Sequence, residues 1–159
     1  MSVRDTGNHE HRYEVRCEWS GATGAGYEAY DRTHTAWAPP ATPRLELSAD
    51  RAFRGDPHLL NPEQLLVLAA ASCQLLSFLA VAARAHVEVL EYKDIGRGVM
   101  KKNDSGMSIT SIALRPNIRV AADTNEQRVR RLVEIAHSEC YVANSIHAEV
   151  TVEPSIVVE

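Results

Sequence analysis

One long uncharged stretch, LLVLAAASCQLLSFLAVAA, runs from Leu65 to Ala83 and constrains the fold more than any other feature. A stretch of about 20 apolar residues can cross a bilayer or form a helix that is buried on all sides. The polar residues Ser72, Gln74 and Ser77 near its centre, together with its many alanines, favour the buried helix. A small domain has difficulty surrounding such a helix, so we expect a second subunit to cover part of it.

The residues before this stretch define where the helix begins. Asn61 is a good N-cap, and Pro62 suits the first helical position. Gln64 completes an Asn-x-x-Gln capping box with Asn61. We therefore predict a helix that begins after Asn61 and ends near Arg84.

Strand patterns surround this helix in the sequence. Alternating apolar and polar residues, or runs of β-branched and aromatic residues between Gly, Pro and Asn clusters, are typical of strands. The sequence KKNDSG at Lys101–Gly106 joins two such segments as a hairpin turn. The predicted strand segments are Tyr13–Trp19, Tyr27–Trp37, Arg44–Ser48, Val87–Met100, Met107–Val120 and His147–Val158.

A second helix is expected between the last two strand segments. Asp123 or Thr124 can cap it, and its apolar residues recur at spacings of three and four and end at Cys140. The predicted order is β-β-β-α-β-β-α-β, with strands grouped instead of strictly alternating with helices, which is typical of the α+β class. No linker divides the sequence, so residues 1–159 are expected to form a single domain.

Charge and cysteine content exclude several classes of protein. Seventeen basic against 21 acidic residues, a net charge of −4, give no support to nucleic-acid binding. The segment Met1–Tyr13 is polar and lacks the apolar run of a secretory signal, so we expect a cytoplasmic protein with reduced thiols. Three cysteines, an odd number, exclude a full disulfide framework.

Two of the cysteines lie on apolar faces of the predicted helices. Cys73 lies near the middle of the first helix, and Cys140 lies at the end of the second. If both apolar faces meet in one core, the two thiols point into the same interior. Spacing alone leaves open whether they act chemically or pack as small apolar side chains. Cys17, on the first predicted strand, is interpreted as structural.

Two blocks of residues carry a resemblance to a known family. The block Asn61–Leu66 (NPEQLL), followed by an Ala-rich run into Ala71–Cys73, resembles the signature helix of the OsmC/Ohr family of thiol peroxidases. The later block His137–Ser145 (HSECYVANS) resembles the second-cysteine motif of the OsmC-like branch. The order of strands and helices agrees over most of the chain.

The resemblance implies an intertwined homodimer that reduces peroxide with a cysteine pair. Cys73 would be the peroxidatic thiolate, which becomes a sulfenic acid. Cys140 would be the resolving thiol, which forms a disulfide with Cys73. An external dithiol, in this family often a lipoyl-type one, would restore the thiols, and no metal, haem or flavin is required.

A buried thiolate needs a stabilising partner, because burial raises the pKa of cysteine. Related enzymes use an arginine held by a glutamate. Glu63 matches the family motif, although an acidic residue in a first turn also favours the helix dipole. Arg32 is the expected arginine and Arg54 the alternative, and either could instead be a solvated surface residue.

Some features of the sequence leave room for other functions. Gln74 stands where relatives commonly have an aromatic residue or a histidine. Aliphatic residues such as Leu66 and Leu76 could line a pocket that suits alkyl or lipid hydroperoxides. The alternatives are a redox sensor or small-molecule binder of the same fold, or a domain without thiol chemistry. A zinc site at His137 and Cys140 lacks further ligands with recognisable spacing.

Overall fold

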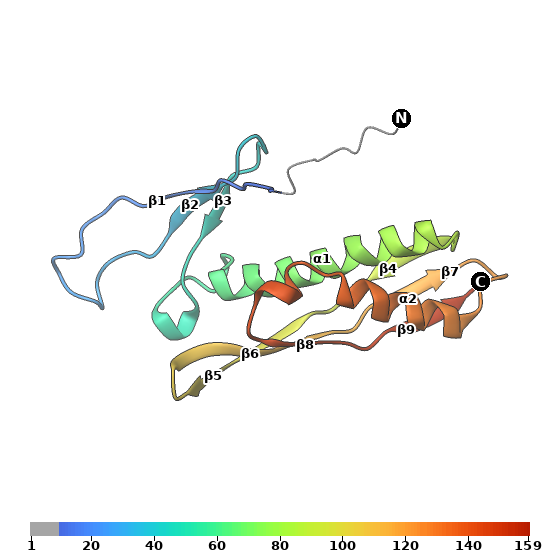
Figure 1. Cartoon of the computed structure of the whole chain (residues 1–159). Coiled ribbons are helices and arrows are strands. Elements are labelled where there is room, and N and C mark those ends of the chain that lie inside the picture. Colours follow the sequence, from blue (N-terminus) through green and yellow to red (C-terminus); the bar gives the residue numbers. More distant parts are fainter. Residues whose placement is uncertain (1–9) are drawn as a thin grey trace. The chain divides into compact units, whose positions relative to one another are not determined.

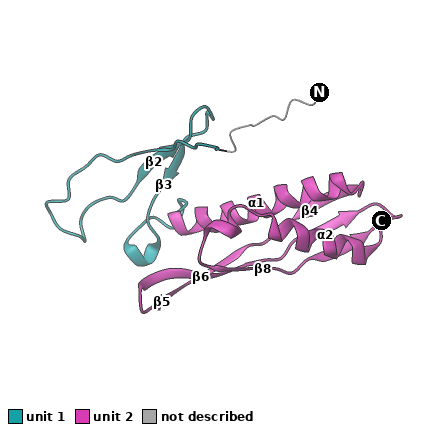
Figure 2. Ribbon diagram, viewed as in Figure 1, with its two compact units in different colours: residues 1–61 teal, residues 62–159 magenta. Residues whose placement is uncertain are grey.

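The computed structural model describes residues 10–159, which form two compact units divided after Asn61 (Figure 2). Unit 1 ends at Asn61 and unit 2 comprises residues 62–159. Most of the polar segment from which we expect no secretory signal lies outside the described residues. The expectation of a single domain stays a prediction.

Unit 1 contains a small antiparallel sheet in the order β1-β2-β3. The strands are β1 (Arg16–Glu18), β2 (His34–Trp37) and β3 (Leu45–Leu47), and each is shorter than predicted. The strand predicted over Tyr27–Trp37 is wrong in its first half. Gly26 has a positive φ of 96°, and the Asp31 side chain accepts a hydrogen bond from the Thr33 backbone N–H at 2.8 Å. Both features hold a turn, which prevents regular strand pairing before His34.

The first helix of unit 2, α1 (Pro62–Arg84), begins and ends as predicted. By length and composition it could cross a membrane, with a mean hydropathy of 2.2 over its most apolar window. It nevertheless packs in unit 2 as a core helix does, against strands and against the second helix (Figure 1). Its buried side chains recur at helical spacing and are Ala70, Gln74, Phe78, Val81 and Ala82.

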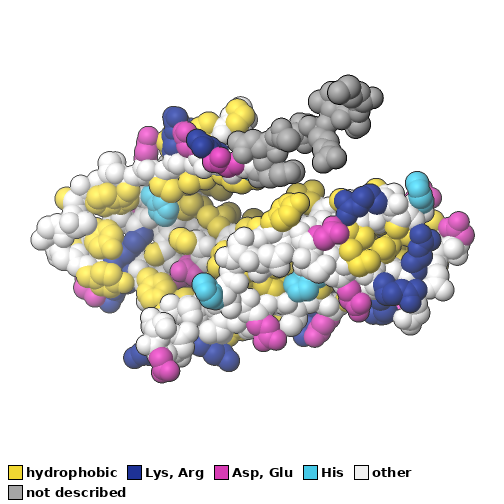
Figure 3. Space-filling model, in the orientation of Figure 1, with side chains coloured by type: hydrophobic (Ala, Val, Ile, Leu, Met, Phe, Trp, Pro, Cys, Tyr) yellow, Lys and Arg dark blue, Asp and Glu magenta, His cyan; other side chains and the backbone are white. Residues whose placement is uncertain are grey.

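The opposite face of α1 is not covered by the other elements of unit 2. Leu68 and Leu76 are 55% and 64% exposed, and Leu79 is 39% exposed. Figure 3 shows hydrophobic side chains on the visible surface of unit 2 between charged ones. Within unit 2, the helix that we expect to be buried on all sides is therefore covered on one side.

The three strand segments predicted after α1 each divide into two strands of different sheets. One sheet has the order β4-β7-β9 and the other β5-β6-β8. In each, the first pair is antiparallel and the last pair is parallel. The strands are β4 (Val89–Lys93), β5 (Arg97–Asn103), β6 (Gly106–Leu114), β7 (Asn117–Val120), β8 (Glu149–Val152) and β9 (Ser155–Val158).

Prolines explain two of these divisions. Pro116 separates β6 from β7, and Pro154 separates β8 from β9, because proline has no N–H to donate to a neighbouring strand. The side chain of Asp94, which follows β4, accepts the backbone N–H of Arg115 at 2.7 Å. This hydrogen bond satisfies a backbone group that the broken ladder leaves unpaired.

The second helix, α2 (Glu126–Ser138), begins later than predicted. Asp123 and Thr124 do not cap it, because Thr124 belongs to a turn in which its N–H donates to the Ala121 carbonyl at 3.0 Å. The N-cap is Asn125, whose side chain accepts the Arg128 backbone N–H at 3.0 Å. Two 3₁₀ turns complete the described elements, η1 (Arg51–Phe53) in unit 1 and η2 (Ala143–Ser145) after α2.

Both helices pack on the same face of the two sheets in unit 2 (Figure 1). Alternate residues of β6 and β7 are buried beneath them, namely Ile112, Leu114, Ile118 and Val120. α1 approaches β5 closely, since a Cβ added at Gly98 would lie 2.5 Å from a methyl carbon of Val67. The predicted α+β class is confirmed.

Candidate functional site

Unit 2 brings Cys73 and Cys140 together. Cys73 lies near the middle of α1, and Cys140 lies two residues after α2 ends at Ser138. The Cys140 thiol is within hydrogen-bonding reach of the Cys73 sulfur. Cys140 is 1% exposed, whereas Cys73 is partly exposed, and both are free thiols. The expectation that the two thiols point into one interior is confirmed.

The surroundings of Cys73 favour its thiolate. Burial opposes ionisation, but the backbone N–H groups of Val142 and Tyr141 donate to the sulfur, and so do the Cys140 thiol and the Ser77 hydroxyl. These donors outweigh burial and lower the pKa of Cys73 below its ordinary value. Cys73 is therefore the more easily ionised thiol of the pair.

Cys140 is affected in the opposite direction. Burial raises its pKa, a backbone hydrogen bond from Ala143 lowers it, and the neighbouring Cys73 raises it again. The net effect is a raised pKa, mainly because burial disfavours the charged thiolate and also because two adjacent sulfurs cannot easily both carry a negative charge. The site thus holds one ionisable thiol that is partly accessible and one protonated thiol that is buried.

The segment after α2 supplies the donors that sequence reasoning missed. Its backbone is held by hydrogen bonds from Asn144 N–H to the Cys140 carbonyl at 3.0 Å and from the Ser145 hydroxyl to the Tyr141 carbonyl at 2.6 Å. This compact turn presents the N–H groups of Tyr141 and Val142 to Cys73. Asn144 and Ser145 of the HSECYVANS block are residue types that often form turns, and they could have indicated this turn from the sequence.

Arg32 lies in unit 1, directly before β2. Its guanidinium stacks on Tyr30 and Tyr27, with ring centroids 3.8 and 4.7 Å away, and donates to the carbonyl oxygens of both residues. Its Nε is buried without a hydrogen-bond partner. The alternative, Arg54, forms an ion pair with Glu28. Arg32 therefore keeps an unused donor, whereas Arg54 has a carboxylate partner within unit 1.

Glu63 lies in unit 2, in the first turn of α1. Its Oε2 atom is buried without a hydrogen-bond partner. Arg32 belongs to unit 1 and Glu63 to unit 2. Their pairing, and its effect on Cys73, stays a prediction.

Gln74 follows Cys73 in sequence but faces the second helix. It is 1% exposed, and its Nε2 donates to the Val133 carbonyl of α2 at 3.4 Å. The side chain therefore connects α1 to α2 within the core.

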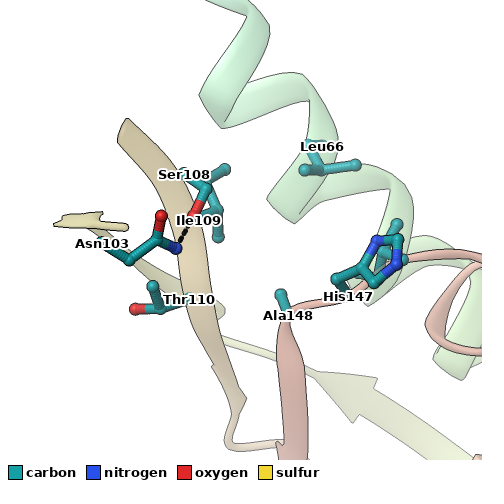
Figure 4. A pocket seen from close by; sticks show the side chains of 8 residues that line it. Leu66, Asn103, Ser108, Ile109, Thr110, His147 and Ala148 are labelled. Atoms are coloured by element: carbon teal, nitrogen blue, oxygen red, sulfur yellow. Dashed lines mark hydrogen bonds between the residues drawn. The ribbon is translucent and has the colours of Figure 1, made fainter. Parts of the chain in front are cut away.

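A cavity of about 360 Å³ lies at the N-terminal end of α1 in unit 2. Figure 4 shows Leu66 of α1, His147 and Ala148 ahead of β8, and Ser108 to Thr110 of β6 around it. Leu66 precedes Cys73 by seven residues, which is two helical turns, so both lie on the same face of α1. The segment that carries His147 also carries the donors to Cys73. Of the predicted wall residues, Leu66 lines this cavity.

No group of three or more His, Cys, Asp or Glu side chains is arranged to hold a metal ion within residues 10–159.

We expect the two thiols to differ in the pH at which they react. Because the pKa of Cys73 is lowered, its thiolate persists to lower pH, and its alkylation by iodoacetamide should have a pH midpoint below the value of a free cysteine. The raised pKa of Cys140 should place its midpoint above that value. Peptide mass spectrometry after timed alkylation measures both, with a cysteine peptide as reference. A lower midpoint for Cys140 than for Cys73 would contradict this assignment.

Comparisons with known proteins agree with this arrangement. Residues 55–155 match the family model described as OsmC-like protein. A search of curated proteins finds no match. Among solved structures, an OsmC-like protein of unknown function from Vibrio cholerae is 26% identical, with a TM-score of 0.82 over 92% of this chain and 100% of that chain.

Two further structures are similar in fold. An organic hydroperoxide resistance protein from Legionella pneumophila is 18% identical, with a TM-score of 0.66 over 93% of this chain and 98% of its own. An organic hydroperoxide resistance protein from Bacillus subtilis is also 18% identical, with a TM-score of 0.63 over 92% and 98%.

Proposed function

This chain belongs to the OsmC-like protein family, and on that premise we propose that it is a cysteine-based peroxidase that reduces organic hydroperoxides. The observation that carries the proposal is the opposite shift of two adjacent thiols. The pKa of Cys73 is lowered mainly by backbone donors that outweigh its burial, and burial raises the pKa of Cys140. A nucleophile and a resolving thiol require this difference.

In the first step, the Cys73 thiolate attacks one oxygen of the hydroperoxide. The O–O bond breaks, the sulfur is oxidised to a sulfenic acid, and the organic alkoxide leaves and takes up a proton to become an alcohol. The N–H groups of Tyr141 and Val142 hold the thiolate before the attack. Because the sulfur itself supplies the two electrons that reduce the hydroperoxide, this step needs no metal or organic cofactor.

In the second step, the Cys140 sulfur attacks the oxidised Cys73. The S–S bond forms, and the hydroxide of the sulfenic acid leaves with the Cys140 proton as water. An external dithiol, of the lipoyl type in line with the family, then reduces the disulfide and is itself oxidised. A dithiol stays reduced in a reducing compartment, so we propose that the protein is cytoplasmic.

Arg32 and Glu63 complete the proposed site. Each has a buried side-chain atom without a hydrogen-bond partner, Nε of Arg32 and Oε2 of Glu63. Buried polar atoms are usually paired, and a guanidinium and a carboxylate are complementary. We propose that Glu63 orients Arg32, which adds a positive charge to the backbone donors at Cys73.

The cavity beside Leu66 is the proposed place for the organic part of the substrate. A Ser108→Trp substitution would fill it from β6, so KM for a bulky aryl hydroperoxide should rise about tenfold, with little change for a small alkyl one. Ser155→Trp is the matched control, because it makes the same change at an exposed position of β9, in the other sheet of unit 2 and outside the cavity lining. Equal effects of the two substitutions on the bulky substrate would contradict this location.

A second copy of the chain is the proposed cover for the exposed face of α1. Leu68, Leu76 and Leu79 form an apolar surface along that face, and burying such a surface favours association. We propose a homodimer. Light scattering on the purified protein should give twice the mass of one chain.

The test of the function is a steady-state assay with an organic hydroperoxide and a dithiol. A peroxidase consumes many equivalents of hydroperoxide for each chain and forms equal amounts of alcohol and oxidised dithiol. Fast oxidation of the thiols without dithiol-dependent turnover would instead indicate a redox sensor. Slow and unselective oxidation would reject thiol chemistry at this site.

A further inference from the structure

The segment from Ser138 to Asn144 forms a closed turn that carries Cys140. The Cys140 N–H donates to the His137 carbonyl at 3.2 Å, and the Cys140 carbonyl accepts the Asn144 N–H at 3.0 Å. The Asn144 side chain reaches back to the end of α2, where its Nδ2 donates to the Ser138 carbonyl at 3.0 Å. Asn144 therefore binds the backbone both at Cys140 and at the residue where α2 ends.

The same turn packs on the face of α1 that carries Cys73. Val142 and Ile146 pack against a buried cluster that includes Ala70. Ala70 precedes Cys73 by three residues, so these two side chains lie on one face of the helix. Apolar contacts thus hold the turn against α1, while Asn144 closes it at the end of α2.

The way in which α2 ends explains why the Asn144 side chain is needed. The last carbonyls of an α-helix have no N–H partner within the helix. Many helices end in a left-handed glycine or asparagine, which brings backbone donors to these carbonyls. In α2 the C-cap is Glu139, which keeps a right-handed backbone with a φ of −90°. Asn144 instead brings a side-chain donor to Ser138 from six residues further along.

We propose that Asn144 is a positioning residue that closes the turn after α2 and so holds Cys140 against Cys73 for disulfide formation. The inference rests on the proposed function and concerns its second step. It gives the Asn144 side chain a role that acts through Cys140, without contact to the substrate.

The geometry of a disulfide explains why this step needs a closed turn. The S–S bond requires the two Cβ atoms to lie about 4 Å apart. Cys73 is fixed within α1, whereas Cys140 lies outside the helix that precedes it. A turn that opens at Ser138 would let Cys140 leave this position, and the sulfenic acid of Cys73 would persist. Limiting this freedom raises the effective concentration of the Cys140 thiol at Cys73.

An Asn144→Ala substitution tests the proposal, because it removes the side-chain donor and keeps the backbone N–H. When one equivalent of organic hydroperoxide is added in the presence of dimedone, the sulfenic acid of Cys73 either reacts with dimedone or forms the disulfide. The ratio of dimedone adduct to disulfide does not depend on the rate of the first step. We expect this ratio to rise about three- to fivefold, the effect of one hydrogen bond between uncharged groups.

Asn125→Ala is the matched control, because it removes an asparagine side-chain hydrogen bond from the opposite end of the same helix. Asn125 caps α2 by accepting the Arg128 N–H at 3.0 Å. Its loss weakens α2 at the end remote from Cys140, so the ratio of adduct to disulfide should stay unchanged. Urea denaturation of both variants checks that they are folded.

A second measurement needs no hydroperoxide. In a glutathione redox buffer, oxidised glutathione takes two electrons from the thiols of Cys73 and Cys140, the disulfide forms, and two molecules of reduced glutathione are released. The equilibrium constant gives the effective concentration of one thiol at the other. It should fall about three- to fivefold in Asn144→Ala and stay unchanged in Asn125→Ala.

The possible outcomes separate this proposal from the function itself. An unchanged adduct ratio and an unchanged effective concentration in Asn144→Ala would overturn the role of Asn144 and leave the peroxidase intact. Equal changes in Asn144→Ala and Asn125→Ala would also overturn it, since that pattern indicates a general weakening of α2. If hydroperoxide forms no disulfide in the unchanged protein while the effective concentration falls in Asn144→Ala alone, the proposed function fails and the positioning of Cys140 by Asn144 stands.

Discussion

Cys73→Ser should reduce hydroperoxide turnover to the rate of the buffer, a loss of at least about a thousandfold. A serine hydroxyl is not ionised near neutral pH, so the donors that stabilise the Cys73 thiolate would have no anion to hold. They are the N–H groups of Tyr141 and Val142. Turnover of an organic hydroperoxide with a dithiol, followed as alcohol formed, measures the effect.

Cys17→Ser is the matched control for this substitution. Cys17 is an exposed free thiol on β1 of unit 1, and the same change of sulfur to oxygen there should leave turnover unchanged. Residual turnover above a tenth in Cys73→Ser, or a comparable loss in Cys17→Ser, would contradict the assignment of the nucleophile.

The largest effect on stability is expected from Phe78→Ala. Phe78 of α1 is fully buried against the sheet and α2, and its ring contacts Tyr92. Loss of a fully buried phenylalanine ring leaves a cavity that the neighbouring side chains fill only in part. The free energy of unfolding should therefore fall by about 3–5 kcal/mol. Urea denaturation followed by circular dichroism measures it.

Phe53→Ala is the comparison, because it makes the same chemical change at the only other phenylalanine of the chain. Phe53 lies in η1 and is 37% exposed, so we expect a loss of about 1 kcal/mol or less. Similar losses for the two variants would contradict the packing described for α1.

The sequence predicted those parts of the fold that depend on local patterns. The predicted bounds of α1 were correct because they depend on Pro62 and on the apolar run of about 20 residues, and both signals lie in the helix itself. The start of α2 was wrong because Asp123, Thr124 and Asn125 can all cap a helix, and the turn at Ala121 decides between them. That choice depends on contacts outside the helix.

The division of the long strand segments was visible in the sequence but was not predicted. Pro116 and Pro154 interrupt hydrogen bonding at matching positions, and Ser155 N–H donates to the Pro116 carbonyl at 2.9 Å. Each proline alone could lie at a bulge or an edge of one strand. Only the pairing of β6 with β8 and of β7 with β9 shows that both prolines mark the same boundary between sheets.

The candidate site was predicted in part. Helical spacing placed Cys73 and Cys140 on apolar faces, and the structure brings them together. The backbone donors of Tyr141 and Val142 were missed, because an N–H group carries no sequence signature and its direction depends on the turn around it. For Arg32 and Glu63, the family resemblance named the residues, and their pairing stays a proposal.

The most direct test of the account is a thiol and disulfide analysis after one equivalent of an organic hydroperoxide is added to the reduced protein. We predict rapid loss of two thiols for each chain, with Cys73 and Cys140 joined in one peptide pair under non-reducing mass spectrometry and Cys17 still free. A disulfide that includes Cys17, or slow oxidation of all three cysteines at similar rates, would contradict the account.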